Sequence, residues 1–158
     1  MKTLVVGDLH LKQQFVLPRI DEMLAGDAEI GRVVFLGDAC DDWGANEADE
    51  LNAMEFYAKW VREHRGRGMR IDVLLGNHDF CYVRGKRGPG SIMSIMHNLR
   101  TILEDALQAK VACAVGPYLC SHAGVTGVWA KRFLADVPAD AVAIAQRLNE
   151  MLADSSHW

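Results

Sequence analysis

Val73-Leu74-Leu75-Gly76-Asn77-His78-Asp79 is the stretch that decides the fold, because it joins a buried strand to a polar cluster. Its aliphatic residues predict a short strand, and the glycine ends it. The three residues that follow can all bind a metal ion or transfer a proton. Open α/β folds build their ligand sites at this place, outside the carboxyl ends of the strands. Alone, the segment also suits an ordinary turn, so its meaning depends on the other strands.

Three further predicted strands also end in short polar segments. In a parallel sheet the carboxyl ends of the strands lie at one edge, so we expect these polar side chains to gather there. The segments are Gly7-Asp8-Leu9-His10 after the strand Lys2–Val6, Gly37-Asp38-Ala39-Cys40-Asp41 after the strand Arg32–Leu36, and Ser121-His122-Ala123-Gly124 after the strand Tyr118–Cys120.

Predicted helices alternate with these strands. Pro18 suits the first turn of a helix that continues to Leu24, and Ser91 is expected to cap a helix that ends at Leu107. Apolar residues at helical spacing predict a third helix over Glu47–His64. The alternation favours an α/β fold with a largely parallel sheet. The remaining predicted elements are the strands Arg70–Leu75 and Val111–Val115 and the helices Gly127–Phe133 and Ala139–Leu152.

Composition narrows the class of protein. A chain of 158 residues fits one domain, here residues 1–158, with a sizeable core. Its net charge of -4 gives no reason to expect a nucleic-acid patch. The four cysteines form no Cys-x-x-Cys pair and are expected to be reduced thiols. No apolar run is long enough to cross a bilayer, and no leader pattern opens the chain, so we expect a cytoplasmic protein without a membrane partner.

The polar residues at the expected sheet edge suit a pair of divalent ions. Asp8 and His10 stand at alternate positions of one loop and can face one point, and a carboxylate with an imidazole suits Mn, Fe or Zn. Asp38 can bridge two ions, while Asn77 and His122 offer a carbonyl oxygen and a second imidazole. Two ions about 3.5–4 Å apart that share a carboxylate and a water form a clamp for in-line attack on phosphorus, with the deprotonated water as nucleophile.

His78 is adjacent to a candidate ligand and has a different expected role. It can protonate the leaving oxygen as a general acid, with Asp41 orienting its ring and raising its basicity. Asp79 is expected to accept a structural hydrogen bond within the turn.

Taken together, the four segments resemble the successive signatures of the calcineurin-like metallophosphoesterases, over about residues 2–125. The segment His122-Ala123-Gly124 is most similar to the serine/threonine phosphatase and bis(nucleosyl)tetraphosphatase branch. The resemblance implies a β-sandwich of two sheets flanked by helices and two divalent ions, with Mn expected and Fe, Zn or Ni as alternatives. It also implies a first ion held by Asp8, His10 and Asp38, a second held by Asp38, Asn77 and His122, and His78 as general acid with Asp41.

One departure from the family pattern concerns the grip on substrate phosphate. The protein phosphatase branch carries Arg-Gly after the acid of its second signature, whereas Asp42-Trp43 stands here. Arg84, Lys86 or Arg87, in a glycine-rich loop, are candidates to replace that arginine, although such a loop also suits an ordinary surface. Trp43 either stacks on an aromatic leaving group or packs over its own loop.

A second departure lies near the carboxyl end. The family carries a further histidine, often within Gly-His-x-His, on a later strand, but this chain reaches Trp158 without it, and His157 is the one histidine after His122. We therefore expect an incomplete second sheet and weak binding of the second ion. Two explanations stay open: a truncated chain or natural fragment, or a minimal variant that covers its apolar surface as a homo-oligomer.

Two functions follow as hypotheses. The first is a two-metal hydrolase that acts on a phosphomonoester or nucleotide anhydride, within a phosphorylated small molecule, a nucleotide or a phosphoprotein. The second is a scaffold of the same fold with an incomplete centre, which binds a partner protein. The missing histidine favours the scaffold, while the pair formed by His78 and Asp41 favours the enzyme.

Overall fold

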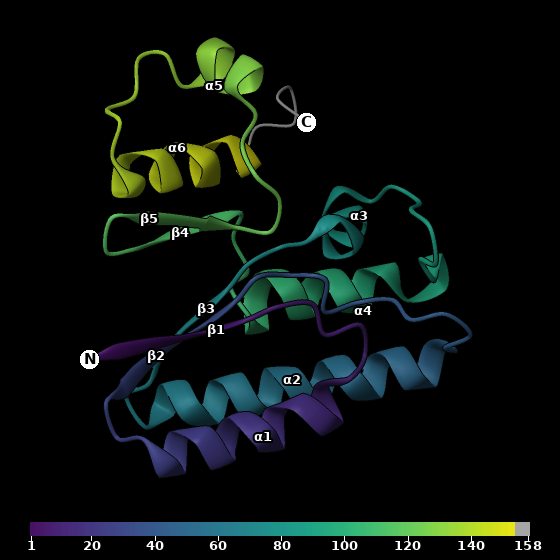
Figure 1. The fold of residues 1–158 in the computed structure, drawn as a ribbon. Helices are drawn as coiled ribbons and strands as arrows, with labels where there is room; N and C mark the ends of the chain where they lie inside the picture. The colour runs from purple at the N-terminus through teal and green to yellow at the C-terminus, as the bar shows by residue number, and fades with distance from the viewer. Residues whose placement is uncertain (154–158) are drawn as a thin grey trace.

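The computed structural model describes residues 1–153 and places the strands of that part of the chain in two sheets (Figure 1). The first sheet is parallel, in the order β1 (Lys2–Val6), β2 (Ile30–Phe35) and β3 (Arg70–Val73). The second is an antiparallel hairpin of β4 (Ala112–Val115) and β5 (Tyr118–Ser121). The expectation of a mixed α/β fold with two sheets and a small second sheet is confirmed.

Helices flank both sheets. In Figure 1, α1 and α2 cover one face of the parallel sheet, and α6 covers the hairpin on the side away from that sheet. No helix within residues 1–153 has the length and hydropathy needed to cross a membrane. In chain order the helical segments are α1 (Gln13–Gly26), α2 (Glu47–Gly66), α3 (Asn77–Arg84), η1 (Met93–Ile95), α4 (Met96–Thr101), the wider turns of η2 (Ile102–Ala106), α5 (Gly127–Phe133) and α6 (Ala141–Ala153).

Side-chain alternation along the strands explains this layering. On β2, Val33 and Phe35 belong to the large core that also holds residues of α1 and α2, whereas Val34 packs with Leu74 and Cys113 between the two sheets. The same rule applies to β4, where Ala112 faces α6 and Cys113 faces the parallel sheet. Two sheets thus pack face to face with helices outside, which is the sandwich that the sequence resemblance implies.

A cluster of ion pairs between side chains lies between the two sheets, away from the carboxyl ends of the parallel strands. Arg32 of β2 donates from Nε to Asp72 Oδ2 at 2.7 Å and from its guanidinium to the carbonyl oxygen of Ala114 at 2.7 Å. The ammonium of Lys110 contacts the other oxygen of Asp72. Burial raises the pKa of Asp72, but Lys110 and Arg32 outweigh it, and the pKa is lowered overall. Three cations therefore balance this carboxylate, since Nε of Arg70 also lies 3.6 Å from Asp72 Oδ2.

Helix α1 begins earlier than predicted. Its first residue is Gln13, so Pro18 lies inside the helix, and the prediction of a first-turn proline was wrong. Tertiary contacts explain the difference, because the buried Gln13 donates from Nε2 to the carbonyl oxygen of Ala39 at 2.8 Å and Leu17 is fully buried. These contacts stabilise the helical turn before Pro18, which the proline alone would disfavour.

The helix predicted after Ser91 is also different. Ser91 does not cap it: its hydroxyl donates to the carbonyl oxygen of Gly88 at 2.8 Å and accepts from the N–H of Gly88 at 2.9 Å, which closes a turn. The helical path begins at Met93 and continues through three segments of changing pitch to Ala106.

Candidate metal centre

The centre lies at the carboxyl edge of the parallel sheet, where the loops after β1, β2 and β3 meet. The N–H groups of Leu9 and His10 donate to the carbonyl oxygen of Asp38 at 3.0 and 2.9 Å, which joins the first two loops. Asp8 and Asp38 each follow a strand and a glycine, as predicted, and Asn77 opens helix α3 directly after Gly76. The predicted turn at residues 77–79 is thus the first turn of a helix.

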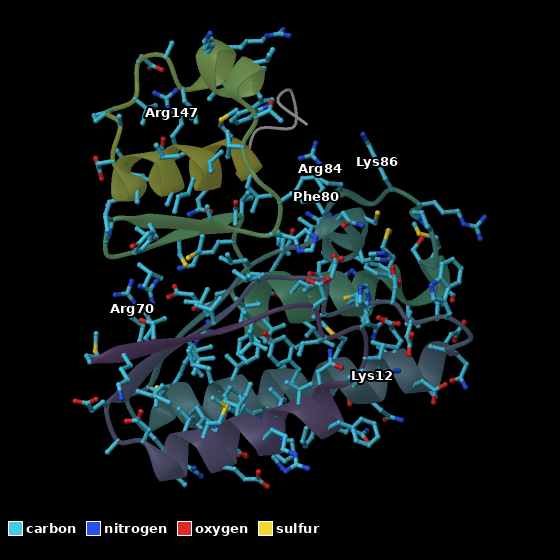
Figure 2. The ribbon with its side chains drawn as sticks, in the orientation of Figure 1. Lys12, Arg70, Phe80, Arg84, Lys86 and Arg147 are labelled. Carbon is cyan, nitrogen blue, oxygen red and sulfur yellow. The ribbon has the colours of Figure 1, made fainter. Side chains whose placement is uncertain are left out.

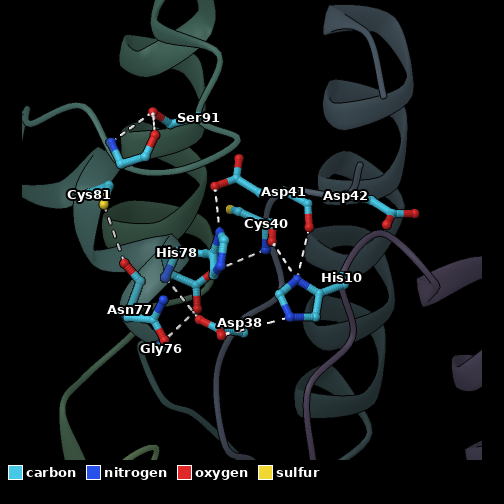
Figure 3. A network of polar contacts seen from close by, with 12 residues as sticks. His10, Asp38, Cys40, Asp41, Asp42, Gly76, Asn77, His78, Cys81 and Ser91 are labelled. Atoms are coloured by element: carbon cyan, nitrogen blue, oxygen red, sulfur yellow. Dashed lines mark hydrogen bonds and ion pairs between the residues drawn. The ribbon is translucent and has the colours of Figure 1, made fainter. Parts of the chain in front are cut away.

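Two glycines allow the second and third loops to approach closely. Gly37 has φ +112°, and a Cβ there would lie 2.3 Å from the backbone nitrogen of Gly76. A Cβ on Gly76 would lie 2.1 Å from Oδ1 of Asp38. Both positions therefore exclude a side chain. The close approach lets the N–H of His78 donate to Asp38 Oδ1 at 2.9 Å, which fixes that carboxylate (Figure 3).

Asp38 stands at the middle of the centre, with 6% of its side chain exposed. Its Oδ2 lies 3.8 Å from Nε2 of His10 and 3.4 Å from Nε2 of His122. Ligand atoms of His10, Asp38 and His78 gather within 4.8 Å of one another, and so do those of Asp8, Asp38 and His122. In both groups Asp38 is the shared member.

Backbone carbonyls set which ring nitrogen each histidine presents. Nδ1 of His10 donates to the carbonyl oxygen of Asp41 at 2.8 Å, and Nδ1 of His122 donates to that of Leu36 at 3.2 Å. Each ring therefore turns the lone pair of Nε2 toward Asp38. Nε2 of His122 also lies 3.2 Å from Oδ1 of Asn77. Atoms that carry lone pairs thus converge on one point, which is the environment that a cation requires.

The negative charge of the centre also affects the pKa of His10. Burial lowers the pKa of His10, but its bond to the Asp41 carbonyl and the carboxylate of Asp38 outweigh burial, and the pKa is raised overall. A metal ion at Nε2 would compete with this proton.

The structure brings together the predicted ligands but groups them differently by distance. The family resemblance pairs Asp8 with His10, whereas Oδ1 of Asp8 lies 3.8 Å from Nδ1 of His122. His78 is close to His10, with ring centroids 5.1 Å apart in an edge arrangement. Their division between two ions stays a prediction.

The predicted pair formed by His78 and Asp41 is present. Nδ1 of His78 lies 2.9 Å from Oδ2 of Asp41, whose side chain is 3% exposed. Tyr82 donates its hydroxyl to the other oxygen of Asp41 and accepts from the N–H of Ile92 at 2.9 Å. Burial, together with the bond to Asp41, raises the pKa of Tyr82, so this phenol remains a donor.

Sequence reasoning missed Tyr82 and Glu50. Tyr82 follows His78 by one helical turn, so the two residues share a helix face. Because residues 77–79 were predicted to form a loop, this spacing could not be recognised from the sequence. Glu50 accepts from the N–H of Asp41 at 3.1 Å and is fully buried. Burial, the largest effect, raises the pKa of Glu50 to about 7. The sequence signal that could have identified Glu50 is its place as an acidic residue among the buried apolar residues of α2.

Asp79 confirms the prediction of a structural acceptor and extends it to a second loop. Its Oδ2 accepts from the N–H of Gly76 at 2.9 Å, and its Oδ1 accepts from the N–H groups of Ala39 and Cys40, each at 2.9 Å. Burial raises the pKa of Asp79 despite these hydrogen bonds, which lower it. The side chain therefore links the loops after β2 and β3.

The predicted substrate residues are separated. Trp43, 88% exposed, lines a pocket of about 230 Å³ together with His10, Asp41 and His78. Arg84 instead lines another cavity beside Leu103 and lies 5.9 Å from the ring centroid of Phe80. Figure 2 shows Lys86 extending outward from the loop after α3, where Arg87 is also exposed.

Comparison with known proteins gives one positive result. The model of the calcineurin-like phosphoesterase family matches residues 1–155. No curated protein and no solved structure matches the chain.

Proposed function

Because the chain belongs to the calcineurin-like phosphoesterase family, we propose that it hydrolyses phosphate esters at a two-metal centre built around Asp38. Membership of this family supports the general part of the proposal, which is metal-dependent hydrolysis of phosphate esters. Two ions, with Mn as the preferred metal, and a phosphorylated small molecule, nucleotide or phosphoprotein as substrate are the finer parts of the proposal.

One observation carries the proposal: the converging donor atoms have no cation to balance them. Within residues 1–153, no Lys or Arg forms an ion pair with Asp8, Asp38 or Asp41. Asp38 and Asp41 are buried, and buried carboxylates normally pair with cations or coordinate metals. The donor set of carboxylate, imidazole and amide oxygen fits Mn, Fe or Zn. When bound, such ions lower the pKa of water and neutralise phosphate oxygens.

Each residue has a role that its contacts support. Asp38 would hold both ions, with His10 on one side and with Asn77 and His122 on the other, while Asp8 completes the set. Asp79, through its bonds to the backbone, keeps the loops after β2 and β3 in register.

His78 supplies the proton for the leaving oxygen. Asp41 accepts from Nδ1, which orients the ring and leaves Nε2 for the substrate. Tyr82 fixes the other oxygen of Asp41, so the carboxylate cannot rotate away.

The test is hydrolysis of an aryl phosphate ester with added Mn. Asp38→Asn is expected to lower the rate at least roughly 100-fold, because even residues that only support metal ligands cost about 10–100-fold. His78→Ala is expected to lower it about 10²–10⁴-fold, as loss of a general acid does. Asp136→Asn, which removes a carboxylate paired with Arg147 on the surface, is the matched control.

Absence of metal-dependent turnover, or an unchanged rate in Asp38→Asn, would contradict the proposal. Counting metals per chain adds a second readout. Two ions would support catalysis, whereas none would favour the alternative of a scaffold that binds a partner protein.

A further inference from the structure

A second pocket lies beside the donor group formed by Asp8, Asp38 and His122. It has a volume of about 400 Å³, and its wall includes Asn77 and His122. The rest of the lining is largely apolar, with Phe80 of α3, Trp129 of α5 and Leu148 of α6 among its members. A cavity of this size that shares two side chains with the candidate centre is suited to part of the substrate.

The two pockets beside the centre are separate. The smaller one contains His10, His78 and Trp43, and the larger one contains Asn77 and His122, so no lining residue is shared. Asp38 belongs to both donor groups and lies at their junction. In an in-line displacement the leaving group departs toward the general acid, which assigns it to the His78 pocket. The apolar pocket therefore fits a second substituent, which stays on phosphorus.

Charge supports the same conclusion. Neither pocket is lined by a Lys or Arg from the described part of the chain. A phosphomonoester carries a charge of about −1.5 to −2 at neutral pH, and beyond the ions proposed for the centre neither pocket offers a Lys or Arg within residues 1–153 for its additional negative oxygen. A diester carries a single negative charge and replaces one of those oxygens with an ester group. The predicted phosphate-gripping candidate Arg84 lines a different cavity.

We propose that the substrate is a phosphodiester whose retained substituent is an apolar, aromatic group seated in the pocket of Phe80 and Trp129. The inference rests on the proposed hydrolase function and names its substrate class. Water adds its oxygen to phosphorus, and the bond from phosphorus to the leaving oxygen breaks. That oxygen takes a proton from His78, which recovers one from the attacking water through solvent. The products are an alcohol or phenol and a monoester that keeps the apolar group.

Three substrates with one leaving group test this assignment with Mn present. They are bis(para-nitrophenyl) phosphate, methyl para-nitrophenyl phosphate and para-nitrophenyl phosphate. Burial of an aromatic ring is expected to raise kcat/KM for the first diester at least about ten-fold above that for the methyl diester. The monoester is expected to be the poorest substrate.

Filling the pocket isolates its contribution. Gly124 lines the pocket, and a Cβ added there meets nothing within 4 Å, so Gly124→Leu adds bulk without removing packing. Gly127→Leu is the matched control, because a Cβ at Gly127 also meets nothing within 4 Å and the residue is outside the lining. In Gly124→Leu the ratio of kcat/KM for the bis-aryl diester to that for the methyl diester should fall to about one, while Gly127→Leu should keep the wild-type ratio.

Equal rates for the two diesters, a faster monoester, or an equal loss for both diesters in Gly124→Leu would overturn the inference. If wild type hydrolyses none of the esters, the hydrolase proposal fails, and the pocket is tested by calorimetric titration with diphenyl and dimethyl phosphate. Tighter binding of diphenyl phosphate that Gly124→Leu weakens and Gly127→Leu does not would still support the pocket. Equal binding of the two would overturn it.

Discussion

Buried carboxylates lie in two parts of the molecule, on β3 between the sheets and around the carboxyl edge of the parallel sheet, and their surroundings differ in kind. Asp72, between the sheets, contacts the guanidinium of Arg32 and the ammonium of Lys110. At the carboxyl edge, Asp38, Asp79 and Glu50 are buried as deeply, yet no Lys or Arg within residues 1–153 pairs with them. Their partners are histidines and backbone N–H groups.

For Asp72 and Asp38 the difference separates a structural use of buried charge from a functional one. A carboxylate with fixed cations is already satisfied and belongs to the packing. Carboxylates without cations raise the free energy of the folded state, and such arrangements persist where a ligand supplies the missing charge. The two groups should therefore respond differently to substitution, to metal and to pH.

The largest effect is expected at the balanced group. Asp72→Asn leaves the guanidinium of Arg32 buried without its counterion, so the free energy of unfolding should fall by about 3–5 kcal/mol. Urea unfolding measures this change. Asp27→Asn, which breaks an exposed pair with Lys2, should cause no measurable loss. Lower activity per folded molecule in Asp72→Asn would contradict a purely structural role.

The next effect concerns the unbalanced group. Mn should stabilise the folded chain by about 2.7 kcal/mol when its concentration is 100 times the Kd, because only the folded state assembles the ligands. A thermal melt with Mn and then with a chelator measures the shift and its reversal. Asp38→Asn should abolish the shift, whereas Asp72→Asn should keep it. A shift that survives in Asp38→Asn would locate the ion elsewhere.

The smallest effect is a dependence on pH. The folded-state pKa of Glu50 is about 7, above the ordinary 4.5. Between these values the folded chain retains a proton that the unfolded chain has released, so stability falls as pH rises through this window and levels off above it. Glu50→Gln keeps an oxygen for the N–H of Asp41 and should reduce this loss by about 1–2 kcal/mol.

Urea unfolding at several pH values between 4.5 and 8 measures that slope, with Glu55→Gln, an exposed position on the same helix, as the control for loss of one charge. An unchanged slope in Glu50→Gln would assign the pH dependence to another group.

The positions of the candidate ligands were predictable because each follows a strand that ends in a glycine or a polar residue. Asp8, Asp38 and Asn77 needed only the rule that parallel strands end at one edge. His122 comes from the antiparallel hairpin, and its approach to Asp38 depends on the packing of the two sheets, which the family resemblance supplied and strand patterns did not.

The parts that sequence reasoning missed depend on contacts between distant segments. Helix α1 includes residues before Pro18 because Gln13 binds the loop after β2. Tyr82 shares a helix face with His78, and Glu50 lies on the apolar face of α2, but only the folded chain shows that both contact Asp41. Local pattern cannot reveal such long-range partners.

The position of His122 has a mechanical consequence. Its ring bonds to the carbonyl oxygen of Leu36, a residue 86 positions earlier in the chain and directly after β2 of the parallel sheet. Any ion that binds Asp38 and His122 together therefore acts as a removable cross-link across a long loop. Because the ligands assemble only in the folded chain, such an ion stabilises the fold by binding to it and, unlike a disulfide, leaves the unfolded chain unrestricted. Metal supply would then regulate how firmly the hairpin layer, with α6 behind it, is fastened to the parallel sheet.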